Sequence, residues 1–143
     1  MNQIIIFPQE LTLDGKICLP AGERIQHLFH HLKLKKNDLV QVAQLNGKRG
    51  VAIVDHLDEY RCSLLWKQDQ PTALPWCDLL VGLCRPLTVK KILEHGTTAG
   101  VGQFHFMNTT LSESSYAKSK ILQPEHYKKY FYLGLAQSRF YTH

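Results

Sequence analysis

Lysine side chains that can neutralise phosphates are the most prominent chemistry-bearing groups in this sequence. Lys33, Lys35 and Lys36 fall in one short segment that ends at Asn37 and Asp38. An ammonium group that contacts a phosphate releases a counterion from a nucleic acid, so such a cluster is typical of nucleic-acid binding. The same cluster is equally consistent with a solvated turn, and the residue types alone do not choose between the two.

The overall charge agrees with an anionic partner. The chain carries a formal charge of +5 and has a pI near 9.1. Residues 1–75 hold nine basic and eight acidic side chains, whereas residues 76–143 hold eight and four. A basic excess is compatible with RNA binding. It is also compatible with a solvated basic surface, so charge does not decide the function.

The histidines and cysteines do not predict a metal site. His27 and His31 stand four residues apart and could share a metal, but no third ligand is evident, so we expect surface or groove histidines. The four cysteines lack CxxC spacing, which favours reduced thiols in an intracellular protein. We find no P-loop, G-x-G-x-x-G, HExxH or catalytic triad, so no catalytic residue is identified. No signal peptide and no membrane helix are expected.

The second half of the chain predicts a strand, a helix and a parallel strand over 78–107. The apolar run 79–84 is typical of a strand covered on both faces, and Pro86 suits a helix start. A stripe at helical spacing follows, and Gly100 and Gly102 end the helix before a strand around His105. Arg85 then lies at the carboxyl end of the first strand, where open α/β sheets place their sites. It is predicted to contact RNA, to support a cofactor pocket or to form a structural ion pair.

The first half of the chain predicts a small barrel. Ile4–Ile6 form a short strand, and hairpins are predicted around Asp14-Gly15 and Asn46-Gly47. One helix begins near Pro20, and its expected buried stripe is Ile25, Leu28, Phe29 and Leu32. Several short strands with a single helix are typical of a small barrel.

A polar, proline-bearing stretch, residues 71–75, separates the two halves and is predicted to be a linker. Residues 108–119 are rich in Ser and Thr and are expected to be loop. Pro124 begins another helix, whose Tyr127, Tyr130 and Phe131 are expected to form helix core or a dimer contact rather than a base-stacking platform.

Particular polar, basic and glycine residues recur within this order of parts: His27, His31-Leu-Lys33, Asn37-Asp38, Asn46-Gly47, Ala52, Gly82, Arg85, Gly100-Val101, Gln137 and Arg139. With these residues, the sequence resembles the bacterial 16S rRNA uridine N3-methyltransferase family, in the SPOUT superfamily of knotted methyltransferases. The resemblance runs from end to end of the chain, but covers only the amino-terminal part of such an enzyme.

The resemblance implies a mixed α+β and α/β fold. Residues 1–70 are expected to form a PUA-like RNA-binding β-barrel, residues 71–75 a linker, and residues 76–143 the first part of a SPOUT methyltransferase domain. The implied activity is S-adenosylmethionine-dependent methylation of a uridine N3 in 16S rRNA, by a cytoplasmic homodimer acting on the small ribosomal subunit. RNA contacts are expected from Arg24, Lys33, Lys35, Lys36, Lys48, Arg49, Arg85 and Arg139.

The family's cofactor loops are absent from these 143 residues. Neither a Gly-Pro-Glu-Gly-Gly type turn nor an Ile-Leu-Arg-x-Glu-Thr-Ala type helix occurs. We therefore expect no cofactor-binding residues in this chain and no methyl transfer by the chain alone. Two further hypotheses stay open: a stand-alone RNA-binding module without catalysis, and a truncated product without an independent role.

Overall fold

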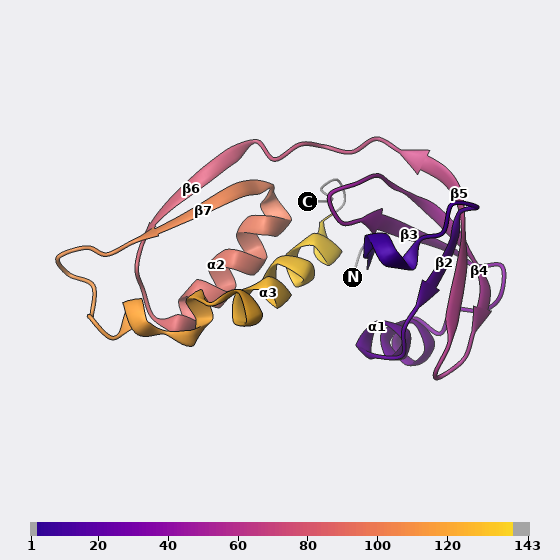
Figure 1. Cartoon of the computed structure of the whole chain (residues 1–143), viewed down its shortest axis with the longest axis horizontal. Helices are drawn as coiled ribbons and strands as arrows, with labels where there is room; N and C mark the ends of the chain where they lie inside the picture. Colours follow the sequence, from indigo (N-terminus) through magenta and orange to yellow (C-terminus); the bar gives the residue numbers. More distant parts are fainter. Residues whose placement is uncertain (1–2, 139–143) are drawn as a thin grey trace. The chain divides into compact units, whose positions relative to one another are not determined.

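A computed structural model describes residues 3–138 of the chain (Figure 1). The chain divides into two compact units, and the division falls between Thr72 and Ala73. Each unit is described by itself below.

The first unit is built on one five-stranded sheet. Its strands are β1 (Ile4–Ile6), β2 (Lys16–Leu19), β3 (Leu39–Gln44), β4 (Arg49–Leu57) and β5 (Cys62–Gln70), in the order β1-β3-β4-β5-β2. β1 runs parallel to β3, and the other neighbours are antiparallel. The outer strands β1 and β2 do not pair with each other within residues 3–138. The sheet is a curled half-barrel, so the small barrel predicted from the sequence is present only in part.

Both predicted hairpin turns are confirmed, but the hairpin around Asp14-Gly15 is simpler than expected. Asn46 adopts φ 55° between β3 and β4, a left-handed conformation that asparagine tolerates. Gly15 adopts φ 81° before β2, as the Asp14-Gly15 pair indicates. The first arm of that hairpin, however, is only a bridge between Leu11 and Ile17 rather than a strand. Leu13 is fully exposed, because the turn carries it away from the sheet.

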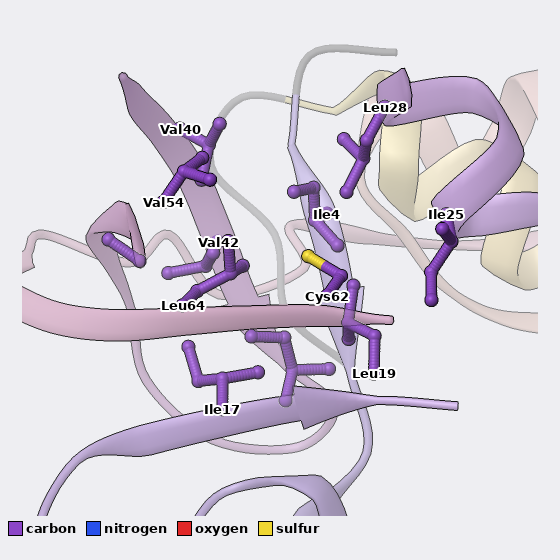
Figure 2. Packing of buried hydrophobic residues seen from close by; sticks show 12 residues of the cluster. Ile4, Ile17, Leu19, Ile25, Leu28, Val40, Val42, Val54, Cys62 and Leu64 are labelled. Atoms are coloured by element: carbon purple, nitrogen blue, oxygen red, sulfur yellow. The ribbon is translucent and has the colours of Figure 1, made fainter. Parts of the chain in front are cut away.

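The core of the first unit lies between the concave face of the sheet and one short helical segment (Figure 2). That segment consists of α1 (Glu23–Gln26) and a π-helical turn, His27–His31. Ile25 and Leu28 are completely buried, as predicted. Leu32 is 45% exposed, so its predicted place in the stripe is wrong. The Leu32 N–H donates to the His27 carbonyl, five residues back, and this wider turn rotates Leu32 away from the core.

The second unit confirms the predicted strand, helix and parallel strand. β6 (Cys77–Gly82) and β7 (Val101–Met107) pair in parallel, and α2 (Pro86–Ala99) connects them. α2 ends at Gly100, whose φ of 91° is the left-handed conformation that favours glycine. Two short 3-10 turns, Tyr116–Lys118 and Lys120–Leu122, then lead into α3 (Pro124–Gln137).

Only one face of the second sheet is covered within the described residues. Val89 and Leu93 of α2 are buried against Ile121, and α3 packs beside them (Figure 1). Along β6 the residues alternate between half-buried and exposed, and Leu80 is 65% exposed. The expectation that this strand is covered on both faces is therefore wrong for this structure. Its apolar run is continuous in the sequence, but both helices pack on one side of the pair.

Candidate nucleic-acid interface

The turn that carries Lys33, Lys35 and Lys36 is rigidly tied to the first unit. Lys33 and Asn37 adopt positive φ values of 51° and 75°, which allow the chain to reverse sharply. The Asp38 carboxylate accepts a hydrogen bond from the Lys35 N–H at 2.7 Å, and the Asn37 N–H donates to Val54 of β4 at 2.8 Å. Leu34 packs against the core from the middle of the turn. The local fold therefore fixes the backbone and directs the lysines outward.

These three lysine side chains are exposed, and none has an ion pair or side-chain hydrogen bond within residues 3–138. Asp38, the acidic residue within the turn, is engaged by the backbone N–H of Lys35. Three ammonium groups on one fixed turn, without a bonded carboxylate, produce a local positive potential. Such a potential attracts phosphate groups and weakens as salt concentration rises.

Lys48 lies in a different environment, above the ring of Trp66. Its Nζ is 4.6 Å from the ring centroid and 3.0 Å from Oδ1 of Asp69, while the Trp66 indole N–H donates to the same oxygen at 2.6 Å. These two hydrogen bonds, from Lys48 first and Trp66 second, hold the pKa of Asp69 below its usual value. Lys48 therefore has a carboxylate partner already, although both groups are about half exposed.

Lys48 and the 33–36 turn do not form one patch. The turn precedes β3, whereas Lys48 follows it, at the opposite end of the β3–β4 pair. Six strand residues at about 3.3 Å each separate the two ends by roughly 20 Å. The sequence analysis placed all four lysines among the expected RNA contacts, but the extended strand β3 holds Lys48 apart from the other three.

Arg24 and Arg49 are placed as structural residues. The Arg24 guanidinium binds both carboxylate oxygens of the buried Glu10 and donates to the Ile5 carbonyl at 2.8 Å. Arg49 is 9% exposed, donates to the Pro71 carbonyl at 3.1 Å, and has its pKa lowered by burial. A guanidinium whose donors are directed at internal acceptors has few left for phosphate. RNA contact by these two arginines stays a prediction, and this placement does not favour it.

Arg85 occupies the position expected from the sequence. It is exposed and caps the amino end of α2, directly after β6, where its carbonyl accepts hydrogen bonds from Thr88 and Val89. Hydrogen bonds from Ser115 and Tyr116 lower the pKa of Glu113, and the charge of Arg85 adds a smaller effect in the same direction. Arg139, the remaining residue of the predicted set, lies outside the described residues.

The sheet edge beside Arg85 is bordered by the loop that follows β7. Ser112 Oγ donates to the Leu83 carbonyl at 2.9 Å and lies 2.9 Å from Thr109 Oγ1, so the loop after β7 closes over this edge. A Cβ on Gly82 would lie 3.0 Å from the Thr109 side chain, so Thr109 stands next to this glycine, which is itself exposed. The glycine-rich cofactor turn of the family does not occur in these 143 residues, and the described residues offer no such loop in its place. We therefore derive no methyl-transfer step from the described residues.

The side chains of His27 and His31 pack against each other. The rings of His27 and His31 stack with centroids 5.3 Å apart, and burial lowers the pKa of His27. Within the described residues, no three His, Cys, Asp or Glu side chains form a group that could hold a metal ion. The four cysteines are free thiols. Among the same residues, no helix has the length and apolar character needed to cross a membrane.

Two arrangements could not be read from the sequence. The approach of Lys48 to Trp66 and Asp69 depends on the β4–β5 register, and the approach of Lys90 to Tyr130 depends on how α2 packs on α3. The only sequence signal for either was the presence of a basic and an aromatic residue in neighbouring elements.

The family of this chain is shown by a match to a family model. The model of the RNA methyltransferase domain matches residues 71–142, half of the chain. The chain belongs to this RNA methyltransferase family. The match begins at the predicted linker and includes the whole of the second unit as the structure describes it, with Arg85 and both helices.

Two curated relatives are also named as RNA methyltransferases. The chain is 28% identical over 138 residues to ribosomal RNA small subunit methyltransferase E of Treponema pallidum, covering 94% of this chain and 52% of the relative. It is 29% identical over 117 residues to ribosomal RNA small subunit methyltransferase E 1 of Borreliella burgdorferi, covering 81% and 49%. This family member therefore spans about half the length of the curated relatives it matches.

A solved structure shares the fold. The chain superposes with a TM-score of 0.59 and 15% identity on a ribosomal RNA small subunit methyltransferase E from Neisseria gonorrhoeae, solved bound to S-adenosyl methionine. The superposition covers 95% of this chain and 58% of the other. The mixed α+β architecture with a curled sheet is thus that of a known methyltransferase structure.

Proposed function

We propose that this chain is the amino-terminal part of an S-adenosylmethionine-dependent ribosomal RNA methyltransferase. The family match over residues 71–142 is the observation that carries this function. The names of the two curated relatives support the small-subunit rRNA as substrate, and the Neisseria structure supports S-adenosylmethionine as the methyl donor. The same match favours an enzyme over a stand-alone RNA-binding module.

The same proposal includes four more specific features of the enzyme. They are methylation at N3 of a uridine in 16S rRNA, a SPOUT knot, a cytoplasmic location and a homodimer. The parallel β6–α2–β7 unit supports a SPOUT domain, because such a unit is the beginning of an open α/β sheet. In this proposal the cofactor is held by segments that correspond to the part of the relatives that the chain does not span.

The role that we propose for the described residues is RNA binding by the first unit, a PUA-like module. The exposed turn with Lys33, Lys35 and Lys36 supports this role, since its lysines have no bonded carboxylate within residues 3–138. In this role the turn positions the rRNA through its phosphates, and the flipped base would be oriented elsewhere.

The test is a binding titration of the 143-residue chain with a fluorescent RNA that contains a small-subunit rRNA helix. Replacing Lys33, Lys35 and Lys36 by Ala is expected to weaken binding about tenfold or more at low salt. It should also reduce the slope of log affinity against log salt by about 2 to 3, since each phosphate contact contributes about 0.9 in a duplex.

The matched control replaces Lys16, Arg61 and Lys67, which are exposed in the same unit, by Ala. This variant has the same loss of charge and should change affinity much less. If both triple variants lose affinity equally, the 33–36 turn acts only through net charge and is not the binding surface. If the unmodified chain does not bind RNA, this proposed role is wrong.

A further inference from the structure

The second unit brings two positive charges to one aromatic ring. The Nζ atoms of Lys90 and Lys129 lie 5.8 Å and 5.2 Å from the centroid of the Tyr130 ring. Lys129 is the neighbour of Tyr130 on α3, but Lys90 comes from α2, so the packing of the two helices creates this cluster. Lys90, Lys129 and Tyr130 are called the helical lysine–tyrosine cluster below.

The positive charge of this cluster is not neutralised within the described residues. Glu94 lies one turn after Lys90, and Glu125 lies one turn before Lys129, yet neither forms an ion pair with these lysines in residues 3–138. Lys91 and Lys128 adjoin the cluster and are exposed. Bringing like charges together costs free energy, and an anionic partner would recover it.

Tyr130 differs from the two aromatic residues beside it. Tyr127 and Phe131 contact each other at 5.4 Å, and Phe131 contacts Phe104 of β7 at 5.6 Å. Tyr130 has no ring-to-ring contact and no hydrogen bond on its hydroxyl among residues 3–138. It is half-buried, so one side of it rests on the helix core while part of the ring remains accessible.

We propose that the helical lysine–tyrosine cluster is a binding site for single-stranded RNA. In this site the Lys90 and Lys129 ammonium groups contact phosphates, and the Tyr130 ring stacks on a base. Many proteins that bind single strands combine cationic side chains along the phosphate backbone with aromatic rings on which the bases stack. Bases in a duplex have both faces stacked already, which restricts the ring to an unpaired strand. This inference rests on the proposed function, and it adds a second RNA contact on a different unit.

The test measures affinity of the whole 143-residue chain for a fluorescent single-stranded RNA oligonucleotide, over a range of salt concentrations. Lys90→Gln with Lys129→Gln is expected to weaken binding at least about fivefold and to lower the salt slope by about 1.4, since each phosphate contact contributes about 0.7 in a single strand. The matched control, Lys91→Gln with Lys128→Gln, has the same loss of charge on the same helices and should weaken binding much less.

Two substitutions at Tyr130 test the ring. Tyr130→Phe keeps a stacking surface and is expected to bind as well as the unmodified chain. Tyr130→Leu removes the ring but stays apolar, and is expected to weaken binding at least about fivefold. Because the ring also packs against the helix core, thermal unfolding is measured for each variant. A purely structural role of the cluster lowers the melting temperature but leaves affinity unchanged in the folded lysine variants, and that result overturns the proposal.

The remaining outcomes separate this inference from the proposed function. Equal loss of affinity in the two double-lysine variants overturns the inference, because it shows an effect of net charge alone. If the 33–36 variant binds RNA poorly while the 90/129 variant binds normally, the inference fails and the proposed function stands. If the unmodified chain binds neither the small-subunit rRNA helix nor the single-stranded oligonucleotide, the proposed RNA-binding role and this inference are both wrong.

Discussion

Thr98 on α2 and Gly134 on α3 are joined by a hydrogen bond at a close contact between the two helices. The Thr98 hydroxyl lies 3.0 Å from the Gly134 carbonyl oxygen and 3.0 Å from the Glu94 carbonyl oxygen, so one donor serves both helices. A Cβ on Gly134 would lie 2.3 Å from the Glu94 oxygen. Only glycine permits this approach, and the approach in turn brings Lys90 to Tyr130.

Replacing Gly134 by Ala is expected to lower the free energy of unfolding by about 1–3 kcal/mol, because the helices must separate to admit the methyl group. Chemical denaturation followed by circular dichroism measures this change. Leu133→Ala, at the exposed neighbouring position, is the control and should have little effect. An unchanged stability in Gly134→Ala would show that the helices tolerate a wider spacing.

Asp58 should titrate well below an ordinary aspartate. Its carboxylate is bonded by His56 at 2.9 Å and by the N–H groups of Tyr60 and Arg61, each at 2.8 Å, and these bonds lower its pKa to about 2. A depressed folded-state pKa contributes stability above the unfolded value of 3.8, and this contribution is lost as pH falls toward about 2.

Carbon-13 NMR of the carboxyl groups measures the Asp58 titration directly. In His56→Ala the midpoint should move upward, toward 3.8, because the largest cause of the shift is removed. The control is Asp69, whose pKa is lowered by separate hydrogen bonds from Lys48 and Trp66, so its midpoint should be the same in both proteins. An Asp58 midpoint that does not respond to His56→Ala would mean that the backbone N–H groups alone set its pKa.

The 143-residue chain should neither bind S-adenosylmethionine specifically nor methylate rRNA. The reason is that neither the glycine-rich cofactor turn nor the cofactor helix of the family occurs in these 143 residues. Isothermal titration measures cofactor binding, and transfer of labelled methyl groups to small-subunit RNA measures activity. Turnover by the purified chain would refute this prediction.

The chain should associate with itself through the second sheet. Leu80 and Met107 lie on its uncovered face, 65% and 44% exposed, and Trp76 just before β6 is 72% exposed. Uncovered apolar surface on a two-stranded sheet favours pairing with another copy. Sedimentation equilibrium should show oligomers, and Leu80→Asn should shift the population toward monomer. Leu13→Asn, at an exposed site in the first unit, is the control. A clean monomer at all concentrations would contradict the prediction.

The elements themselves were largely determined by the sequence, because their signals are local. Pro86 and Gly100 delimit α2, Asn46-Gly47 joins β3 to β4, and Val89 and Leu93 share the buried face of their helix. Each of these depends on backbone preferences or on spacing within a few residues. The π-helical turn at His27–His31 was not predictable in this way, since it is tertiary packing that moves Leu32 off the stripe.

The roles of the basic residues were decided only by the tertiary structure. From the sequence, Arg24, Arg49, Lys33 and Lys48 were equal candidates for RNA contact. Residue type alone does not show whether a positive charge is exposed, buried or paired with a carboxylate. Folding buried Arg49, bound Arg24 to Glu10 and paired Lys48 with Asp69, while the lysines of the 33–36 turn remained exposed. Whether a charge is available to a partner depends on long-range contacts, and these are formed only when strands find their register and helices pack.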